Sequence, residues 1–130
     1  MKTTHIDPDD IVKLNVLNYT HGKLIEGAKD WLVLSGQIGV RPDGTWSDSF
    51  EDQANQAYTN IAACLRDAGM SMSDAAFTRI FLTRREDLED FRKVRAAHQG
   101  DNSIPSTLLF VSGLAHPDWL IEVEIVACKG

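Results

Sequence analysis

The chain has 130 residues, of which 43% are hydrophobic and 25% charged, a composition typical of one soluble domain with a buried core. Its 13 basic and 19 acidic side chains give a formal net charge of −6, so Coulomb repulsion disfavours binding to the phosphate backbone of nucleic acids. Cys64 and Cys128 lack the spacing of a metal clip or a secreted disulfide framework, and there is neither an apolar signal region nor a run of about 18 apolar residues. We therefore expect a single cytoplasmic domain over residues 1–130 that binds neither nucleic acid nor membranes.

Strands are expected in the first part of the chain. Residues 23–26 (KLIE) and 31–34 (WLVL) are short β-prone runs, and the turn-like segment 27–30 between them predicts a β-hairpin. The second strand is expected to continue to Val40. The two glycines in this continuation indicate a bulge, or the close approach of another backbone or a ligand.

The next segment has the period of an amphipathic helix. From Phe50 to Ala68, apolar or small side chains recur at intervals of three and four residues. Ser49 together with Asp52 resembles a capping box at the start, and Gly69 is placed to end the helix with a left-handed residue. We therefore expect a helix over 50–68.

The second half of the chain predicts a strand, a helix and two more strands. The strands cover residues 76–83, 107–111 and 120–127, and the helix between the first two carries its apolar face on Leu88, Phe91, Val94 and Ala97. The resulting order, β-β-α-β-α-β-β, predicts an α+β domain with both helices on one face of a sheet. Because the strand at 107–111 has apolar residues on both sides, we expect a partner subunit to cover the other face.

No local motif carries a reaction by itself. The chain lacks a G-x-S-x-G elbow, a P-loop and an H-E-x-x-H helix, and its histidines lie at no ligand spacing, so no metal site is expected. Glu122 and Glu124 alternate with branched aliphatic residues, which places both carboxylates on one face of the last strand. Either this face is simply solvated, or a buried carboxylate there positions or deprotonates a water molecule.

Further polar residues have a structural and a functional interpretation. Tyr19 is either a core ring or a ring whose hydroxyl is free to bind, and Ser35 with Gly36 offers backbone amides to a ligand unless Gly36 only marks a bulge. Ser106 and Thr107, taken alone, only begin a strand.

Several of these segments occur together in one known family. The chain resembles the Rid (reactive intermediate deaminase, or YjgF) family over nearly its full length, in the segments YTHG (19–22), LSGQIGV (34–40), Gln53 to Asn60, Ala68-Gly69, PST (105–107) and IEVE (121–124). The resemblance implies a chorismate-mutase-like α+β fold of the bacillus type, with two helices on one face of a mixed sheet. It also implies a homotrimer with a barrel-like core and a small-molecule ligand in each cleft between subunits. The implied activity is the hydrolysis of reactive enamines and imines, such as 2-aminoacrylate, to keto acids and ammonia without metal or organic cofactor.

One position departs from the family pattern. In active deaminases of the family, the arginine of a P-x-R-[ST] segment pairs with the substrate carboxylate. Aligned without gaps on residues 105–108, that arginine position is Thr107, and with a shift of one residue it is Ser106. A carboxylate would then be held by hydroxyls, by backbone amides or by a basic residue from elsewhere, such as His21 or Arg41. A neutral ligand is the alternative.

Tyr19, Ser35, Gly36 and Glu122 match site positions of the family. Glu122 corresponds to the glutamate that orients the attacking water, and we expect it to be catalytic. The expected substrate-binding residues are Tyr19, Ser35, Gly36, Ser106 and Thr107. The sequence thus predicts an enamine/imine deaminase with non-standard substrate recognition. The alternatives are a non-catalytic trimer that binds a metabolite or regulates, and a specialised deaminase of a larger unsaturated amino acid such as 2-aminomuconate.

Overall fold

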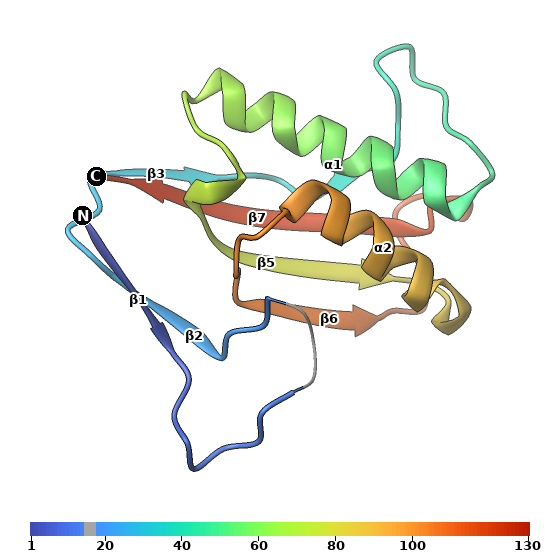
Figure 1. Cartoon of the computed structure of the whole chain (residues 1–130). Coiled ribbons are helices and arrows are strands. Elements are labelled where there is room, and N and C mark those ends of the chain that lie inside the picture. Colours follow the sequence, from blue (N-terminus) through green and yellow to red (C-terminus); the bar gives the residue numbers. More distant parts are fainter. Residues whose placement is uncertain (15–17) are drawn as a thin grey trace.

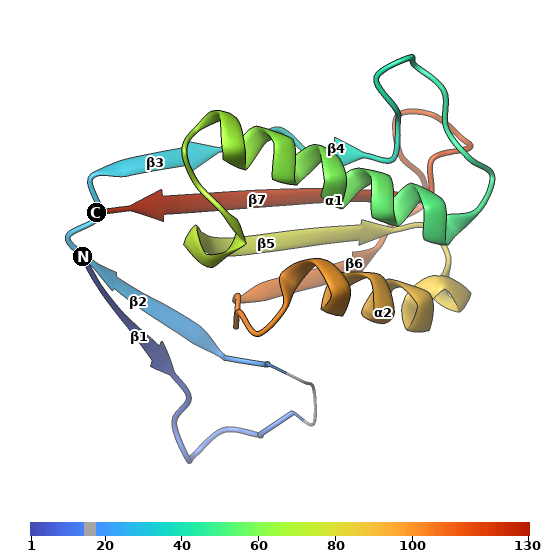
Figure 2. The same cartoon turned by 45° about the horizontal axis from the view of Figure 1, so that its top comes forward.

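Two helices cover one face of a five-stranded sheet (Figures 1 and 2). The computed structural model describes residues 1–14 and 18–130. The helices are α1 (Phe50–Asp67) and α2 (Leu88–Gln99), and the strands of the sheet are β3 (Asp30–Val33), β4 (Gln37–Ile38), β5 (Ala75–Leu82), β6 (Ser106–Phe110) and β7 (Ile121–Lys129). The strand order is β3-β7-β5-β6, and β4 also pairs with β7. The sheet is mixed, because β6 runs parallel to β5 while β7 is antiparallel to β3, β4 and β5.

A separate two-stranded ribbon of β1 (Lys2–Ile6) and β2 (Gly22–Glu26) extends away from the sheet (Figure 2). The predicted hairpin of residues 23–26 with 31–34 is therefore wrong. β2 pairs with β1, whose sequence KTTHI has no apolar alternation, and β3 pairs with β7. Gly27, with φ +76°, redirects the chain from the ribbon into the sheet instead of closing a hairpin.

The strand expected to continue to Val40 is interrupted. β3 ends at Val33, and pairing resumes only at Gln37–Ile38 in β4. Close approach of another backbone is confirmed at Gly39, where a Cβ would collide with the Gln53 backbone of α1; at Gly36 a Cβ would collide with the Glu122 side chain instead. A side chain at position 36 would displace the Glu122 side chain, whereas one at position 39 would force the backbone of α1 to move.

The first helix begins and ends as its sequence predicts. The Ser49 hydroxyl accepts a hydrogen bond from the Asp52 amide at 3.4 Å, and Gly69 has φ +70° directly after the C-cap residue Ala68. The face toward the sheet buries Phe50, Gln53, Ala54, Ala57, Tyr58, Ile61 and Leu65. The predicted α+β class, with both helices on one face, is confirmed.

The two faces of the sheet differ in chemistry. On β7, Ile121, Val123 and Ile125 are buried beneath the helices, and the alternate residues lie on the opposite side. We call this opposite side the open face; strand alternation and register assign to it Trp31, Val33, Phe77, Arg79, Phe81, Thr107, Leu109, Glu122, Glu124 and Val126. No helix in the described ranges is both long and apolar enough to span a bilayer.

Candidate functional site

Glu122 lies near the start of β7, on the open face of the sheet. It is half-buried, and its register partners are Ile38 of β4 and Phe81 of β5. A Cβ built on Gly36 would lie 2.7 Å from Cδ and 2.8 Å from Oε2 of Glu122. The carboxyl group therefore occupies the space that a side chain at position 36 would fill.

The segment between β3 and β4 adds polar backbone groups beside this carboxylate. The Leu34 amide still donates to the Ile125 carbonyl at 3.2 Å, and the Gln37 side chain donates to the Ser35 carbonyl at 3.1 Å. Within residues 1–14 and 18–130, the amides of Ser35 and Gly36 donate to no partner. Gly36 is the residue packed against Glu122, and a backbone N–H group without a protein partner suits an electron-rich ligand atom.

A second group of polar residues lies further along the same face. Arg79 of β5 is paired in register with Glu124 of β7 on one side and with Thr107 of β6 on the other. Its Nη1 donates to Oε2 of Glu124 at 2.8 Å, with side-chain exposures of 43% and 36%. The three residues form one row across the sheet, next to the row that holds Glu122.

The two hydroxyls predicted at the start of β6 lie on opposite faces. Alternation along the strand places Ser106 on the side of Leu108 and Phe110, which pack against the hydrophobic core. Thr107 is exposed and lies on the open face. In one subunit, only Thr107 shares a face with Glu122.

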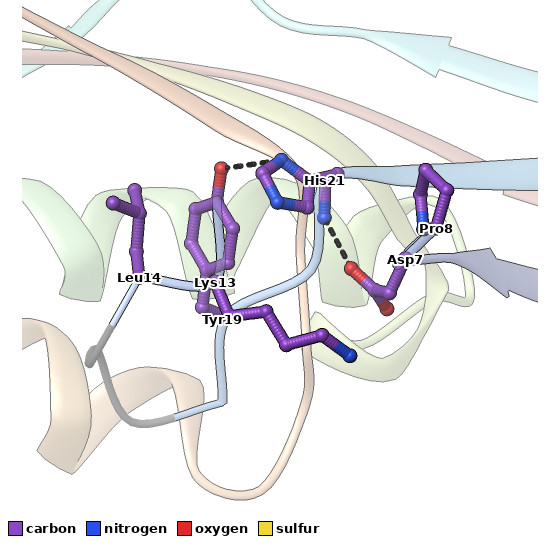
Figure 3. Close-up of a pocket in the computed structure, with 6 residues that line it drawn as sticks. All are labelled: Asp7, Pro8, Lys13, Leu14, Tyr19 and His21. Carbon is purple, nitrogen blue, oxygen red and sulfur yellow. Dashed lines mark hydrogen bonds between the residues drawn. The ribbon is translucent and has the colours of Figure 1, made fainter. Parts of the chain in front are cut away.

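Tyr19 lies in a pocket of about 230 Å³ beside the N-terminal ribbon (Figure 3). The pocket is lined by Asp7, Pro8, Lys13, Leu14, Tyr19 and His21. The Tyr19 hydroxyl is 3.1 Å from Nδ1 of His21, and Nε2 of the same ring is 2.7 Å from the Val12 carbonyl. Because a carbonyl only accepts, Nε2 carries the proton of the neutral ring and Nδ1 accepts the hydrogen bond from Tyr19. The tyrosine oxygen then keeps its lone pairs for a ligand.

Asp7 fixes the position of this tyrosine and histidine. One carboxylate oxygen accepts from the His21 amide at 2.7 Å and the other from the Thr20 hydroxyl at 2.9 Å. The hydrogen bond from the His21 backbone is the main cause that lowers the pKa of Asp7 below its usual 3.8, with the Thr20 hydroxyl adding to it. Sequence reasoning missed this role, because Asp7 directly follows β1, a strand whose sequence showed no β pattern.

The predicted site residues fall into two groups within one chain. Glu122 and Thr107 belong to the sheet and Gly36 to the segment packed against Glu122, whereas Tyr19 belongs to the N-terminal pocket, whose lining includes none of the other predicted residues. Among the described residues, no three His, Cys, Asp or Glu side chains are grouped so that they would hold a metal ion.

Comparison with known proteins identifies the family. The sequence profile of the family described as Endoribonuclease L-PSP matches residues 14–129. The chain belongs to this family, the Rid (YjgF) family. A crystal structure of the Rid family protein YyfB from Yersinia pestis, described as of unknown function, superposes with a TM-score of 0.86 at 22% identity. The superposition covers 99% of this chain and 100% of the Yersinia chain, and it confirms the fold.

The names of some curated relatives in the Rid family include a function. A Salmonella typhimurium protein named 2-iminobutanoate/2-iminopropanoate deaminase is 28% identical over 104 residues, which are 75% of this chain and 79% of the relative. A Lactococcus lactis protein named putative regulator AldR is 32% identical over 114 residues, which are 84% of this chain and 85% of the relative. The family therefore contains imine deaminases, and this chain is a Rid-like protein of that family.

Proposed function

We propose that this Rid protein hydrolyses the C=N bond of small imino acids. Water adds to the imine carbon, and the resulting carbinolamine expels ammonia to leave a keto acid. The reaction exchanges no electrons, so the proposal needs no redox cofactor. The observation that carries the proposal is the Glu122 carboxyl group held against the Gly36 backbone, in a family that contains imine deaminases.

Glu122 acts as the water-binding group in this proposal. A half-buried carboxylate accepts a hydrogen bond from water, aligns the water lone pair with the imine carbon, and takes the proton that the water loses on attack. The N–H groups of Ser35 and Gly36, which donate to no backbone partner, supply hydrogen bonds to polar atoms of the ligand. Thr107 adds a hydroxyl from β6.

A homotrimer completes the site. The open face exposes large apolar side chains, with Trp31 56%, Val33 73% and Leu109 38% exposed. Packing of these residues against neighbouring copies removes them from water and brings the Tyr19 pocket of one subunit toward the Glu122 row of another. Ligands then bind in the clefts between subunits, where Tyr19 joins the residues of the open face, while Ser106 stays on the helix-covered side of β6.

A regulatory role without catalysis is the second candidate, and the relative named putative regulator AldR favours it. In that case, the same cleft binds a metabolite and releases it unchanged. The nuclease term in the family description receives no support from this chain, because its net charge of −6 repels a phosphate backbone.

Ammonia release from freshly generated 2-iminopropanoate and 2-iminobutanoate tests the proposal. The imines form in the assay from alanine and 2-aminobutanoate with an amino-acid oxidase, and hydrolysis is followed with and without the protein. We expect catalytic acceleration together with formation of the matching keto acid. Binding of the keto acid without any acceleration of ammonia release would instead support the regulatory candidate.

A further inference from the structure

We propose that Arg79 binds the carboxylate of the ligand from β5, so that the cation missing from β6 is supplied by the neighbouring strand. The inference rests on the proposed function, because it assigns the anion-binding group of the same site. It explains how the site binds a carboxylate although Thr107 occupies the position where a basic residue is expected.

Strand register places Arg79 beside Thr107. The two residues are direct partners in the parallel pairing of β5 with β6, and both lie on the open face. Adjacent strands are about 4.8 Å apart, so a guanidinium on Arg79 reaches the space above Thr107 without any change of the backbone. The Thr107 hydroxyl is then a second donor to the same anion.

The distance from Arg79 to the proposed water-binding group suits a small imino acid. Glu122 lies two residues before Glu124, the register partner of Arg79, so the two rows are about 7 Å apart along the strands. In a 2-imino acid, the carboxylate is bonded directly to the imine carbon. An anion held above Arg79 and Thr107 therefore turns the imine carbon toward the Glu122 row.

Arg79 retains donors for a ligand. Its contact with Glu124 uses one N–H group, and the guanidinium has no other hydrogen-bond partner in the described part of the chain. The Phe77 ring lies 5.4 Å below the guanidinium carbon and helps to hold its plane. Glu124 thus orients the cation from one edge and leaves the other edge for a bidentate pair with a carboxylate.

No other basic residue of the sheet is placed to bind the ligand carboxylate as Arg79 is. The strands β3 to β7 contain one further basic residue, Lys129, whose Nζ donates to the Gly69 carbonyl just beyond α1. His21, a basic residue considered from the sequence, lies in the pocket of the N-terminal ribbon, where its ring bonds Tyr19 and the Val12 carbonyl. Arg41 donates to the Thr45 hydroxyl in its own turn.

Calorimetric titration with a charged and an uncharged ligand tests the assignment. The probes are 2-oxobutanoate, the keto acid that hydrolysis of 2-iminobutanoate yields, and its amide, which differs in the missing charge. The variants are Arg79→Gln, Arg79→Lys and the double variant Arg79→Thr/Thr107→Arg. Arg92→Gln is the control, because Arg92 also pairs with one glutamate but lies exposed on α2.

We expect Arg79→Gln to weaken binding of 2-oxobutanoate by about tenfold or more while binding of the amide stays the same. The affinity of Arg79→Lys for 2-oxobutanoate should lie between those of the wild type and Arg79→Gln, because lysine keeps the charge but loses the bidentate contact. The double variant should bind 2-oxobutanoate within about threefold of the wild type, because the charge returns on the neighbouring strand. Equal binding of 2-oxobutanoate by wild type and Arg79→Gln would overturn the inference. So would an equal loss for both ligands.

The titration and the ammonia-release assay together separate this inference from the proposed function. Arg79-dependent binding of the carboxylate by a protein that releases no ammonia would reject the deaminase proposal and retain the role of Arg79. Rapid ammonia release with an unchanged KM in Arg79→Gln would reject the role of Arg79 and retain the deaminase proposal.

Discussion

The carboxyl group of Glu122 lies where the side chain of residue 36 would be if that residue were not glycine. The Glu122 atoms Cδ and Oε2 are 2.7 and 2.8 Å from the position of a Cβ at Gly36. The contact joins the irregular segment after β3 to the first residues of β7. The absence of a side chain at position 36 therefore allows the proposed water-binding group to take its position.

Gly36→Ala should reduce turnover more than stability. The added methyl group displaces a flexible carboxylate rather than backbone, so the fold tolerates it, but the displaced carboxylate no longer aligns water. We expect kcat for ammonia release to fall about tenfold or more, with a change in unfolding free energy below about 1 kcal/mol. Gly113→Ala is the matched control, because a Cβ there meets no atom within 4 Å. Equal turnover of the two variants would contradict this role of Gly36.

Gln53→Leu should destabilise the domain. The Gln53 side chain is 1% exposed; its amide donates to the carbonyls of Ser47 and Asp118, and its oxygen accepts from the Leu120 amide. Leucine leaves these buried groups without partners, at a cost of about 2–4 kcal/mol in the free energy of unfolding. Urea denaturation measures the loss. Gln56→Leu, on the same helix, removes a bond to the Asn60 side chain alone, so a cost as large as that of Gln53→Leu would refute the argument.

The ends of α1 and the two faces of β7 could be predicted from the sequence, because they depend on local signals. Ser49 and Gly69 mark the ends of α1, and the alternation around Glu122 gives the two faces of β7, because caps and side-chain period are encoded within one segment. The same alternation correctly placed Glu122 and Glu124 together on one face.

The remaining features depend on contacts between distant segments. β1 has no periodic pattern and forms because Thr3 and Ile25, far apart in the chain, meet as partners. Arg79 and Thr107 are neighbours because of the parallel register of β5 with β6, the two strands that α2 connects. No local sequence signal specifies that register. The N-terminal pocket was missed for the same reason, since Asp7 and His21 meet only through the ribbon.

Stability should fall as the pH drops below 6.5, in part because of His98. Partial burial lowers the pKa of His98 below its ordinary value of 6.5, and its ring stacks on Tyr58 and bonds the Asn55 side chain. Between the two pKa values the unfolded chain binds a proton that the folded chain does not, so the stabilisation is complete above pH 6.5 and is lost on acidification. Thermal unfolding of wild type and His98→Gln between pH 7.5 and 5 checks this. His98→Gln should lose less stability over that range, and identical pH slopes would contradict the assignment.

Val33→Lys should dissociate the proposed trimer. Val33 is 73% exposed on the open face, and a charge there would have to be buried without a partner when subunits pack against this face. Light scattering should give the mass of a trimer for wild type and of a monomer for the variant. Ala63→Lys, at an exposed position of α1, should remain trimeric. A wild type that is a stable monomer would contradict both the assembly and the shared cleft.

The kcat of Glu122→Gln for ammonia release from 2-iminobutanoate tests the central claim most directly. Glutamine keeps the size of the side chain and its packing on Gly36 but cannot accept the proton of the attacking water. We predict a loss of about 100-fold or more in kcat. Glu26→Gln, an exposed change on β2, should keep the wild-type rate. Full turnover in Glu122→Gln would contradict the claim that this carboxylate activates the water.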